Sequence, residues 1–229
     1  VNDGSKDHTH RVLKQLTIKV KELSVICLRK NYGQTAAMAA GFDNSKGDIV
    51  ITLDGDLQND PKDIPKLISE INNGYDLICG WRFDRKDKLI NRKIPSKIAN
   101  KLIAKVTGLK LHDYGCSLKA FRKEIIDDIK LYGELHRFLP VLANIEGARI
   151  KEIKVNHRSR KYGSSKYGID RTFRVLMDLL TVWFMTKFLT RPMYGFGFVG
   201  IISIFFSLAI SSYLIVLKIM GEDIGNRPL

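Results

Sequence analysis

The chain has 229 residues, of which 45% are hydrophobic and 27% charged, and its formal net charge is +14. This length and balance fit a folded α/β domain with an appendage, and they exclude a disordered or fibrous chain and a disulfide-rich miniprotein. Its three cysteines cannot all pair, so we expect a reduced, cytosol-facing chain with Cys27 and Cys79 as small buried hydrophobes.

The positive charge is concentrated in two segments. Residues 82–130 hold 14 basic and 6 acidic side chains, and residues 147–191 hold 11 basic and 3 acidic ones, whereas residues 1–81 are nearly neutral. Such segments indicate nucleic acid, a phosphorylated ligand or an anionic membrane as a partner.

Helical and strand-like segments alternate along the chain. The predicted helices and strands are helices 9–16, 33–44, 61–72 and 95–107, and strands 24–28, 48–53 and 76–80. The apolar run 48–53 is typical of a buried parallel strand, so the alternation predicts an α/β sheet with right-handed crossovers. Ligands of such sheets gather where strands end.

Three polar residues, Asp54, Asp56 and Gln58, follow the strand at 48–53 directly. If the extended backbone continues, residues two apart point to the same side, and the three side chains converge. Two carboxylates and an amide oxygen suit Mg²⁺ or Mn²⁺. A solvated acidic turn is the alternative, but the position after a buried strand favours a metal site.

Two other strand ends carry residues suited to a ligand. In VNDGSKD at 1–7, Asp3 is able to accept hydrogen bonds from a base or ribose, and Gly4 lets a ligand lie close to the backbone. A helix cap is the alternative there. Lys30 precedes the Ala-rich helix at 33–44, whose N-terminus suits an anion. We expect that the strand ending at Val1 begins before this sequence.

Three later segments are weak signals when taken singly. Asp113 lies in a glycine-containing loop typical of a turn, and a surface position is the simplest interpretation of His136 beside Arg137. Residues 158–166 form a basic loop without the P-loop pattern, which either folds over a diphosphate or is a solvated linker.

The end of the chain indicates a membrane. Met193–Leu217 contains no charge over 25 residues, enough to cross a bilayer, with a buried core helix as the alternative. Residues 171–189 predict an amphipathic helix in the headgroup region, with a soluble core helix as the alternative. The basic flank places residues 1–191 in the cytoplasm. We expect a catalytic domain at 1–166, a juxtamembrane helix at 167–191, a transmembrane helix at 192–220 and a truncated loop at 221–229.

Taken together, the motifs resemble those of family 2 glycosyltransferases, in particular the polyprenyl-phosphate sugar transferases. The matching segments occur in family order: VNDGSKD at 1–7, RKNYGQTAAMAAG at 29–41, LDGDLQNDP at 53–61, GWR at 80–82, DYGCSLKAFR at 113–122, ELHRF at 134–138 and RKYGSSK at 160–166. Their joint order and spacing are far more specific than any one of them.

The resemblance implies an α/β, GT-A-like nucleotide-sugar-binding domain whose first strand is missing from this sequence. It assigns Asp113 and Asp56 to catalysis and Asp54, Asp56 and Gln58 to Mg²⁺ or Mn²⁺. The other residues that it assigns are Asp3, Gly4, Lys30, Asp54 and Arg82 for the nucleotide sugar, and His136, Arg137, Arg160, Ser165 and Lys166 for phosphate and acceptor.

The implied reaction is inverting transfer of a sugar from a nucleotide sugar to polyprenyl phosphate at the cytoplasmic face of the plasma membrane. UDP-glucose is the first donor to expect, with GDP-mannose and modified UDP-sugars open. A membrane-anchored enzyme acting on a saccharide is an alternative, although the sequence has no Q-x-x-R-W motif. A non-catalytic basic module would leave D-x-D-x-Q unexplained. The expected partners are the donor, the lipid acceptor and an anionic membrane, with no nucleic acid and homo-oligomerisation open.

Overall fold

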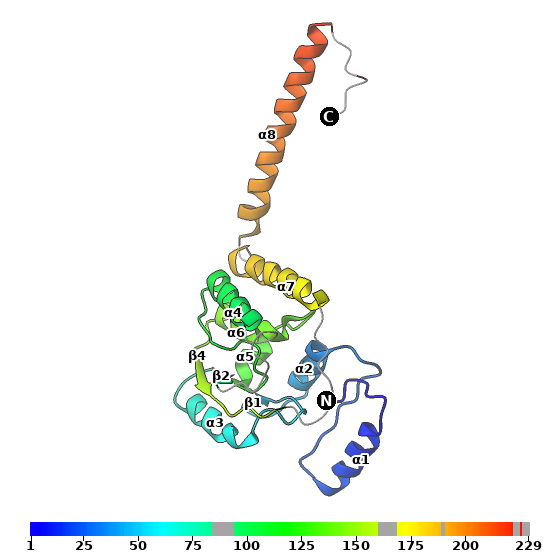
Figure 1. Cartoon of the computed structure of the whole chain (residues 1–229), viewed down its shortest axis with the longest axis vertical. Coiled ribbons are helices and arrows are strands. Elements are labelled where there is room, and N and C mark those ends of the chain that lie inside the picture. The colour runs from blue at the N-terminus through cyan, green and yellow to red at the C-terminus, as the bar shows by residue number, and fades with distance from the viewer. Residues whose placement is uncertain (84–93, 160–168, 189–190, 222–224, 226–229) are drawn as a thin grey trace. The chain divides into compact units, whose positions relative to one another are not determined.

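The structure is a computed structural model that describes residues 1–83, 94–159, 169–188, 191–221 and 225 (Figure 1). The chain divides into two compact units, Val1–Val182 and Trp183–Leu229, and each is treated by itself.

Four short strands and a series of helices make up the described chain. The strands are β1 (Ile49–Thr52), β2 (Leu77–Trp81), β3 (Lys119–Arg122) and β4 (Ile150–Lys154). The helices are α1 (Thr9–Lys19), α2 (Gln34–Asp43), η1 (Pro61–Asp63), α3 (Ile64–Asn72), α4 (Ile94–Thr107), α5 (Lys123–Asp128), η3 (Leu135–Phe138), α6 (Leu139–Ile145), α7 (Ile169–Phe188) and α8 (Pro192–Ile219).

The sheet is mixed, with the strand order β1-β3-β2-β4. Strand β3 pairs antiparallel with both β1 and β2, while β2 and β4 are parallel. The prediction that 48–53 forms a strand is confirmed, but its expected parallel pairing is wrong, because β3 lies between β1 and β2. As a result the carboxyl ends of β1, β2 and β4 meet at the edge where β3 begins.

Helix α3 covers one face of this sheet. Leu67 and Ile71 of the helix pack on a fully buried layer from the strands and the loop before β3. On the other face Phe121 of β3 meets Phe42 of α2 edge to face, with 5.7 Å between the ring centroids. Burial of these apolar surfaces is the main stabilising contribution, and it fixes the sheet edge that carries the candidate site.

The segment at 24–28 does not form the expected strand. It makes one isolated parallel bridge, between Cys27 and Asn2, which is closed by backbone hydrogen bonds of 2.7 and 2.9 Å. The expectation of a buried Cys27 is therefore wrong, since its side chain is exposed, whereas Cys79 and Cys116 are buried. A bridge of one residue pair cannot cover both faces of this segment.

Helix α7 begins in the first unit. Within that unit Leu179 and Val182 are buried, while Met177 and Leu180 are exposed. The helix therefore packs one apolar side inside the unit, as the soluble alternative requires, and leaves other apolar side chains on the surface.

The second unit contains α8, an uninterrupted helix of 28 residues (Figure 1). Its most apolar stretch has a mean hydropathy of 2.3, and none of that stretch is buried. At 1.5 Å per residue such a helix is about 42 Å long, which exceeds the hydrocarbon thickness of a bilayer. By length and composition α8 is able to span a membrane.

Candidate active site

The carboxylates Asp54 and Asp56 lie just beyond β1, at the sheet edge where the other strands also end. The expected extended backbone does not continue, because residues 55–57 turn and Leu57 has a φ of 63°. A leucine in this left-handed region is strained and requires support from its surroundings. The backbone amide of Gln58 donates to Asp56 Oδ1 at 3.1 Å, so a turn joins these residues instead of a straight strand.

The surroundings of Asp54 shift the pKa of its carboxyl group in both directions. It reaches solvent, yet the protein around it partly desolvates it, and this desolvation raises its pKa. A hydrogen bond with Ser117 lowers the pKa and the charge of Asp56 raises it, while Lys119 and Arg82 act in the lowering direction. Desolvation prevails, so the ionised form of Asp54 is disfavoured in the protein alone.

This pair of carboxylates fits a divalent cation. Asp54 and Asp56 are close enough for one charge to raise the pKa of the other, and hard carboxylate oxygens are the ligands that Mg²⁺ and Mn²⁺ take. The Gln58 side chain would bind a cation through Oε1, and its Nε2 lies 3.4 Å from the Arg158 carbonyl oxygen. Among the described residues there is no cluster of three or more His, Cys, Asp or Glu with the geometry of a metal site. A cluster of that kind does not include an amide ligand, so the binding of a cation by Asp54, Asp56 and Gln58 stays a prediction.

Asp3 is fastened to the start of α2. Its carboxylate accepts hydrogen bonds from the backbone amides of Tyr32 at 2.7 Å and Gly33 at 2.9 Å. Gly4 beside it has a φ of 64°, and a Cβ there would lie 2.3 Å from the Lys30 carbonyl carbon. Only glycine allows the two segments to cross this closely.

The first turn of α2 connects three motifs that are far apart in sequence. Gly33 donates to Asp3, Gln34 Nε2 donates to Asp54 Oδ1 at 3.0 Å, and the Thr35 hydroxyl lies 2.7 Å from His136 Nδ1. His136 is 8% exposed, so the interpretation of it as a surface histidine is wrong. No role was predicted for Gln34 or Thr35, although both lie inside the motif at 29–41.

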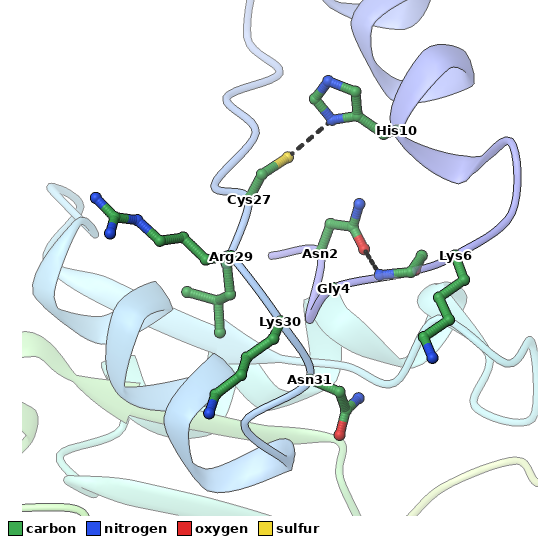
Figure 2. Close-up of a pocket in the computed structure, with 10 residues that line it drawn as sticks. Asn2, Gly4, Lys6, His10, Cys27, Arg29, Lys30 and Asn31 are labelled. Atoms are coloured by element: carbon green, nitrogen blue, oxygen red, sulfur yellow. Dashed lines mark hydrogen bonds between the residues drawn. The ribbon is translucent and has the colours of Figure 1, made fainter.

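A cavity of about 320 Å³ opens between residues 2–10 and 27–31. Figure 2 shows Lys6 and Lys30 beside the crossing at Gly4, and the His10 ring directed at Cys27 with 3.2 Å between Nδ1 and Sγ. The charged residues that line the cavity, Lys6, Arg29 and Lys30, are all basic. Such a lining suits an anionic ligand, and it includes Gly4 and Lys30 from the predicted donor site.

Asp113 is buried and paired with Arg82. The guanidinium donates through Nε at 2.6 Å and through a second nitrogen at 2.8 Å, so the pair is bidentate. Only 3% of Asp113 is exposed. This geometry brings two of the predicted residues together and holds both rigidly at the ends of β2 and the loop before β3.

The loop that carries Asp113 is held from β4 by a residue that the sequence analysis missed. Glu152 accepts hydrogen bonds from the backbone amides of His112 at 3.0 Å and Asp113 at 2.8 Å. Buried Lys119 also holds this loop, by donating hydrogen bonds to the carbonyl oxygens of Tyr114 and Cys116. The strand reads IKEIK, in which charged and apolar residues do not alternate strictly, so no local pattern distinguished Glu152.

The four other predicted phosphate-binding residues are Arg137, Arg160, Ser165 and Lys166. Arg137 contacts Glu134 at 3.3 Å, one turn earlier on its own segment. Arg160, Ser165 and Lys166 lie outside the described residues.

Comparison with known proteins gives a consistent result at the level of sequence. The family model described as glycosyl transferase family 2 matches residues 1–130. A dodecaprenyl-phosphate galacturonate synthase of Rhizobium johnstonii is 49% identical over 234 residues, covering 100% of this chain and 69% of the relative. An undecaprenyl-phosphate 4-deoxy-4-formamido-L-arabinose transferase of Aeromonas hydrophila is 39% identical, covering 97% of this chain and 67% of the relative.

A second transferase with that arabinose name, from Pseudomonas fluorescens, is 40% identical over 88% of this chain and 59% of its own length. The chain therefore spans about two thirds of these relatives, or less.

Among solved structures, the fold is similar to glucosyl-3-phosphoglycerate synthase of Mycobacterium tuberculosis, crystallised with Mn²⁺ and UDP-glucose. The TM-score is 0.55 at 15% identity, over 80% of this chain and 65% of that one. At this identity the likeness shows the fold alone, which is an α/β fold of the GT-A type.

Proposed function

We propose a function for this chain, which belongs to glycosyltransferase family 2. It transfers a sugar from a nucleotide sugar to a polyprenyl phosphate, with inversion at the anomeric carbon. The observation that carries the proposal is the electrostatically coupled pair Asp54 and Asp56 at the end of β1, beside the Arg82–Asp113 ion pair. Relatives named for transfer to dodecaprenyl and undecaprenyl phosphate support the acceptor class.

The donor's nucleotide is proposed to lie against the crossing of residues 2–4 with residues 29–31. The basic cavity there supports an anionic ligand, and Gly4 keeps the surface open to close approach. Lys30 adds positive charge at this place. Asp3 has a structural role in this site. Its carboxylate accepts two backbone hydrogen bonds and so holds residues 2–4 against the start of α2.

A divalent cation is proposed to bind Asp54 and Asp56. When bound, it would stabilise the charge that grows on the leaving diphosphate. Gln34 holds Asp54 by a hydrogen bond at 3.0 Å and so positions one of these carboxylates. Mn²⁺ in the solved glucosyl-3-phosphoglycerate synthase structure supports the choice of cation class.

The proposed reaction is a single displacement. An oxygen of the lipid phosphate forms a bond to the anomeric carbon of the sugar, and the bond from that carbon to the diphosphate oxygen breaks, releasing the nucleoside diphosphate. A phosphate monoester has a second pKa near 6, so the attacking group is already ionised at pH 7. A strong general base is then unnecessary, which agrees with an Asp113 held in a bidentate pair with Arg82.

The sugar is proposed from the relatives rather than from the site. Galacturonate appears in the name of the relative at 49% identity and 4-deoxy-4-formamido-L-arabinose in the names of those at 39% and 40%. We place galacturonate first, ahead of the UDP-glucose expected from the sequence pattern, because the higher identity covers the whole of this chain.

The membrane position is proposed from α8 and the charge distribution. An apolar helix able to span a bilayer and a basic flank before it support a site on the cytoplasmic face. Basic segments would also concentrate the protein at anionic lipid, where the acceptor phosphate lies.

The test uses the protein in membranes with undecaprenyl phosphate and labelled nucleotide sugars carrying galacturonate, glucose or 4-deoxy-4-formamido-L-arabinose. Label in the extracted lipid that disappears with chelator and in Asp56→Ala would support the proposal and identify the sugar. Exposed Asp43 at the end of α2 supplies the matched control, Asp43→Ala, which should retain the label in the lipid. Label that enters only a water-soluble glycan would establish the saccharide-acceptor alternative, and no transfer from any donor would refute the enzymatic function.

A further inference from the structure

An exposed cluster of aromatic and basic side chains lies at the ends of β2 and β4, which we call the His112 cluster; it consists of Trp81, Phe83, His112 and Lys154. The His112 ring stacks on Trp81, with 4.1 Å between centroids and 15° between planes. Lys154 Nζ lies 5.5 Å from the Trp81 ring and 4.2 Å from the Phe83 ring. None of these four residues has a role in the proposed donor or metal site.

The orientation of His112 is fixed by a buried carboxylate. Its Nδ1 lies 2.7 Å from Glu152 Oε2, and the side chains of His112 and Glu152 are 67% and 9% exposed. Because an ionised carboxylate only accepts hydrogen bonds, Nδ1 carries the proton in this contact, and Nε2 is left to interact with a ligand. Stacking on Trp81 holds the plane of the ring.

Glu152 is itself rigidly placed. It projects from β4, and besides the His112 ring it accepts the backbone amides of His112 and Asp113. The same side chain thus orients His112 and the loop that presents Asp113. A histidine that is exposed and yet held in both plane and rotation is arranged for binding rather than for packing.

The cluster adjoins the candidate active site through the chain itself. Arg82 stands between Trp81 and Phe83 in the sequence and His112 precedes Asp113, so both members of the Arg82–Asp113 pair are chain neighbours of the cluster. Phe83 is 61% exposed. The surface therefore offers cationic groups next to aromatic rings, of which Phe83 is largely exposed, at the margin of the place where the sugar would be transferred.

We propose that the His112 cluster binds the phosphate end of the isoprenoid acceptor. As the imidazolium, His112 donates from Nδ1 to Glu152 and from Nε2 to a phosphate oxygen, Lys154 Nζ donates to the same phosphate, and Trp81 and Phe83 contact the first isoprene units. The aromatic surface favours the lipid over the donor diphosphate, because the donor has no apolar chain to cover it. The inference rests on the proposed function and adds the location of the acceptor.

Trp81 supplies a direct binding signal. The chain has two tryptophans, so in a Trp183→Phe background Trp81 is the single fluorescent indole. The full chain in detergent is titrated with farnesyl phosphate, farnesol, inorganic phosphate and UDP. We expect a saturable change in emission with farnesyl phosphate, weaker binding of farnesol and inorganic phosphate, and an affinity for farnesyl phosphate about tenfold lower in His112→Gln, the loss expected for one charge-assisted hydrogen bond.

Two further variants sharpen the test. His8→Gln changes an exposed histidine outside the cluster and should leave the affinity unchanged. Glu152→Gln should weaken farnesyl phosphate binding, and combining it with His112→Gln should add little, since Glu152 acts through the ring that is already absent. Additive losses would refute the positioning role of Glu152.

Transfer kinetics separate this inference from the proposed function. If the wild-type protein transfers sugar to undecaprenyl phosphate, His112→Gln should raise the KM for the lipid about tenfold and leave the KM for the donor unchanged. An unchanged lipid KM, or a Trp81 signal as strong with UDP as with farnesyl phosphate, would overturn the inference alone. Absence of transfer by the wild type would instead refute the proposed function.

Discussion

Three carboxylates of the candidate site differ in what compensates their charge. Asp3 accepts two backbone amides, and Asp113 faces the guanidinium of Arg82. Asp54 has hydrogen bonds from Gln34 and Ser117 but also the repulsion of Asp56. A divalent cation would stabilise ionised Asp54 more than the other two carboxylates, because it adds positive charge where the negative charges of Asp54 and Asp56 meet.

Replacing Asp54 by Asn should separate its electrostatic cost from its role in binding metal. The raised pKa of Asp54 means that the folded state holds this proton more tightly than the unfolded chain does. The free energy of unfolding therefore falls as the pH rises from the ordinary carboxyl range through the raised pKa. At pH 7 without metal, Asp54→Asn should raise the Tm, and it should abolish the increase that Mn²⁺ gives to the wild type.

Thermal unfolding in detergent, with and without Mn²⁺, measures both effects. The control Asp43→Asn, at the exposed end of α2, should behave as the wild type. A variant Asp54→Asn that keeps the full Mn²⁺ response would contradict the assignment of this carboxylate to the cation.

Replacing Asp113 by Asn tests a different function. The amide keeps one acceptor but no longer neutralises Arg82, so the guanidinium is released from its fixed position. Because small displacements of positioning groups are costly, kcat should fall about a hundredfold. Steady-state kinetics with lipid acceptor measures this, and since the acceptor phosphate is already ionised, the loss should persist across pH 7 to 8. Turnover near that of the wild type would exclude both positioning and proton transfer by Asp113.

At the scale of elements, the first turn of α2 carries more of the site than any strand does. Its three successive residues, Gly33, Gln34 and Thr35, contact the segments of Asp3, Asp54 and His136. The helix N-terminus is thus the place where the N-terminal segment, the end of β1 and the segment η3 are joined. A change in this turn should disturb several motifs together.

Thr35→Val should show the contribution of that junction to stability. The valine removes the buried contact between the hydroxyl and His136 Nδ1 while nearly keeping the volume. Loss of one partner of a buried hydrogen bond costs about 1–3 kcal/mol. Urea denaturation of the first unit measures the difference in the free energy of unfolding between wild type and variant. Thr35→Ser, which retains the hydroxyl, should recover most of the lost stability. Equal losses in the two variants would assign the effect to packing.

At the scale of the whole molecule, the two units have surfaces of opposite character. The first buries its apolar side chains around a mixed sheet, whereas the most apolar stretch of α8 in the second is wholly unburied. An exposed apolar helix of 28 residues would be strongly unfavourable in water, which supports the proposal that α8 lies in a bilayer.

Arginines in α8 should therefore release the protein from membranes. Substituting Ile204→Arg and Leu208→Arg together places two charges in the middle of the helix, each costing about 2.5–3.5 kcal/mol of insertion free energy. The fraction resistant to alkaline carbonate extraction should fall sharply. Met220→Arg, just past the end of the helix, is the matched control and should remain resistant. Full retention of the double variant would contradict a membrane span by α8.

Local patterns predicted a large part of this protein. The strands at 48–53 and 76–80, the helices at 9–16, 33–44, 61–72 and 95–107, and the apolar helix near the C-terminus are confirmed within a few residues at their ends. The family is also confirmed. It was predictable because its motifs are short segments that occur in a specific order. These features depend on neighbouring residues or on helical and strand periodicity, which the sequence displays directly.

Contacts between distant segments were decided by the tertiary structure. Thr35 and His136 are 101 residues apart, and His112 and Glu152 are 40 apart, yet each pair lies within hydrogen-bond distance. The place of β3 inside the sheet also depends on long-range pairing, and neither the turn at Leu57 nor the exposure of Cys27 was visible in the local pattern. The sequence alone determined which residues have the chemistry for this reaction. Only the packing of strands and loops decided which of them face one another, because that choice depends on the energy of the whole fold and not on any local pattern.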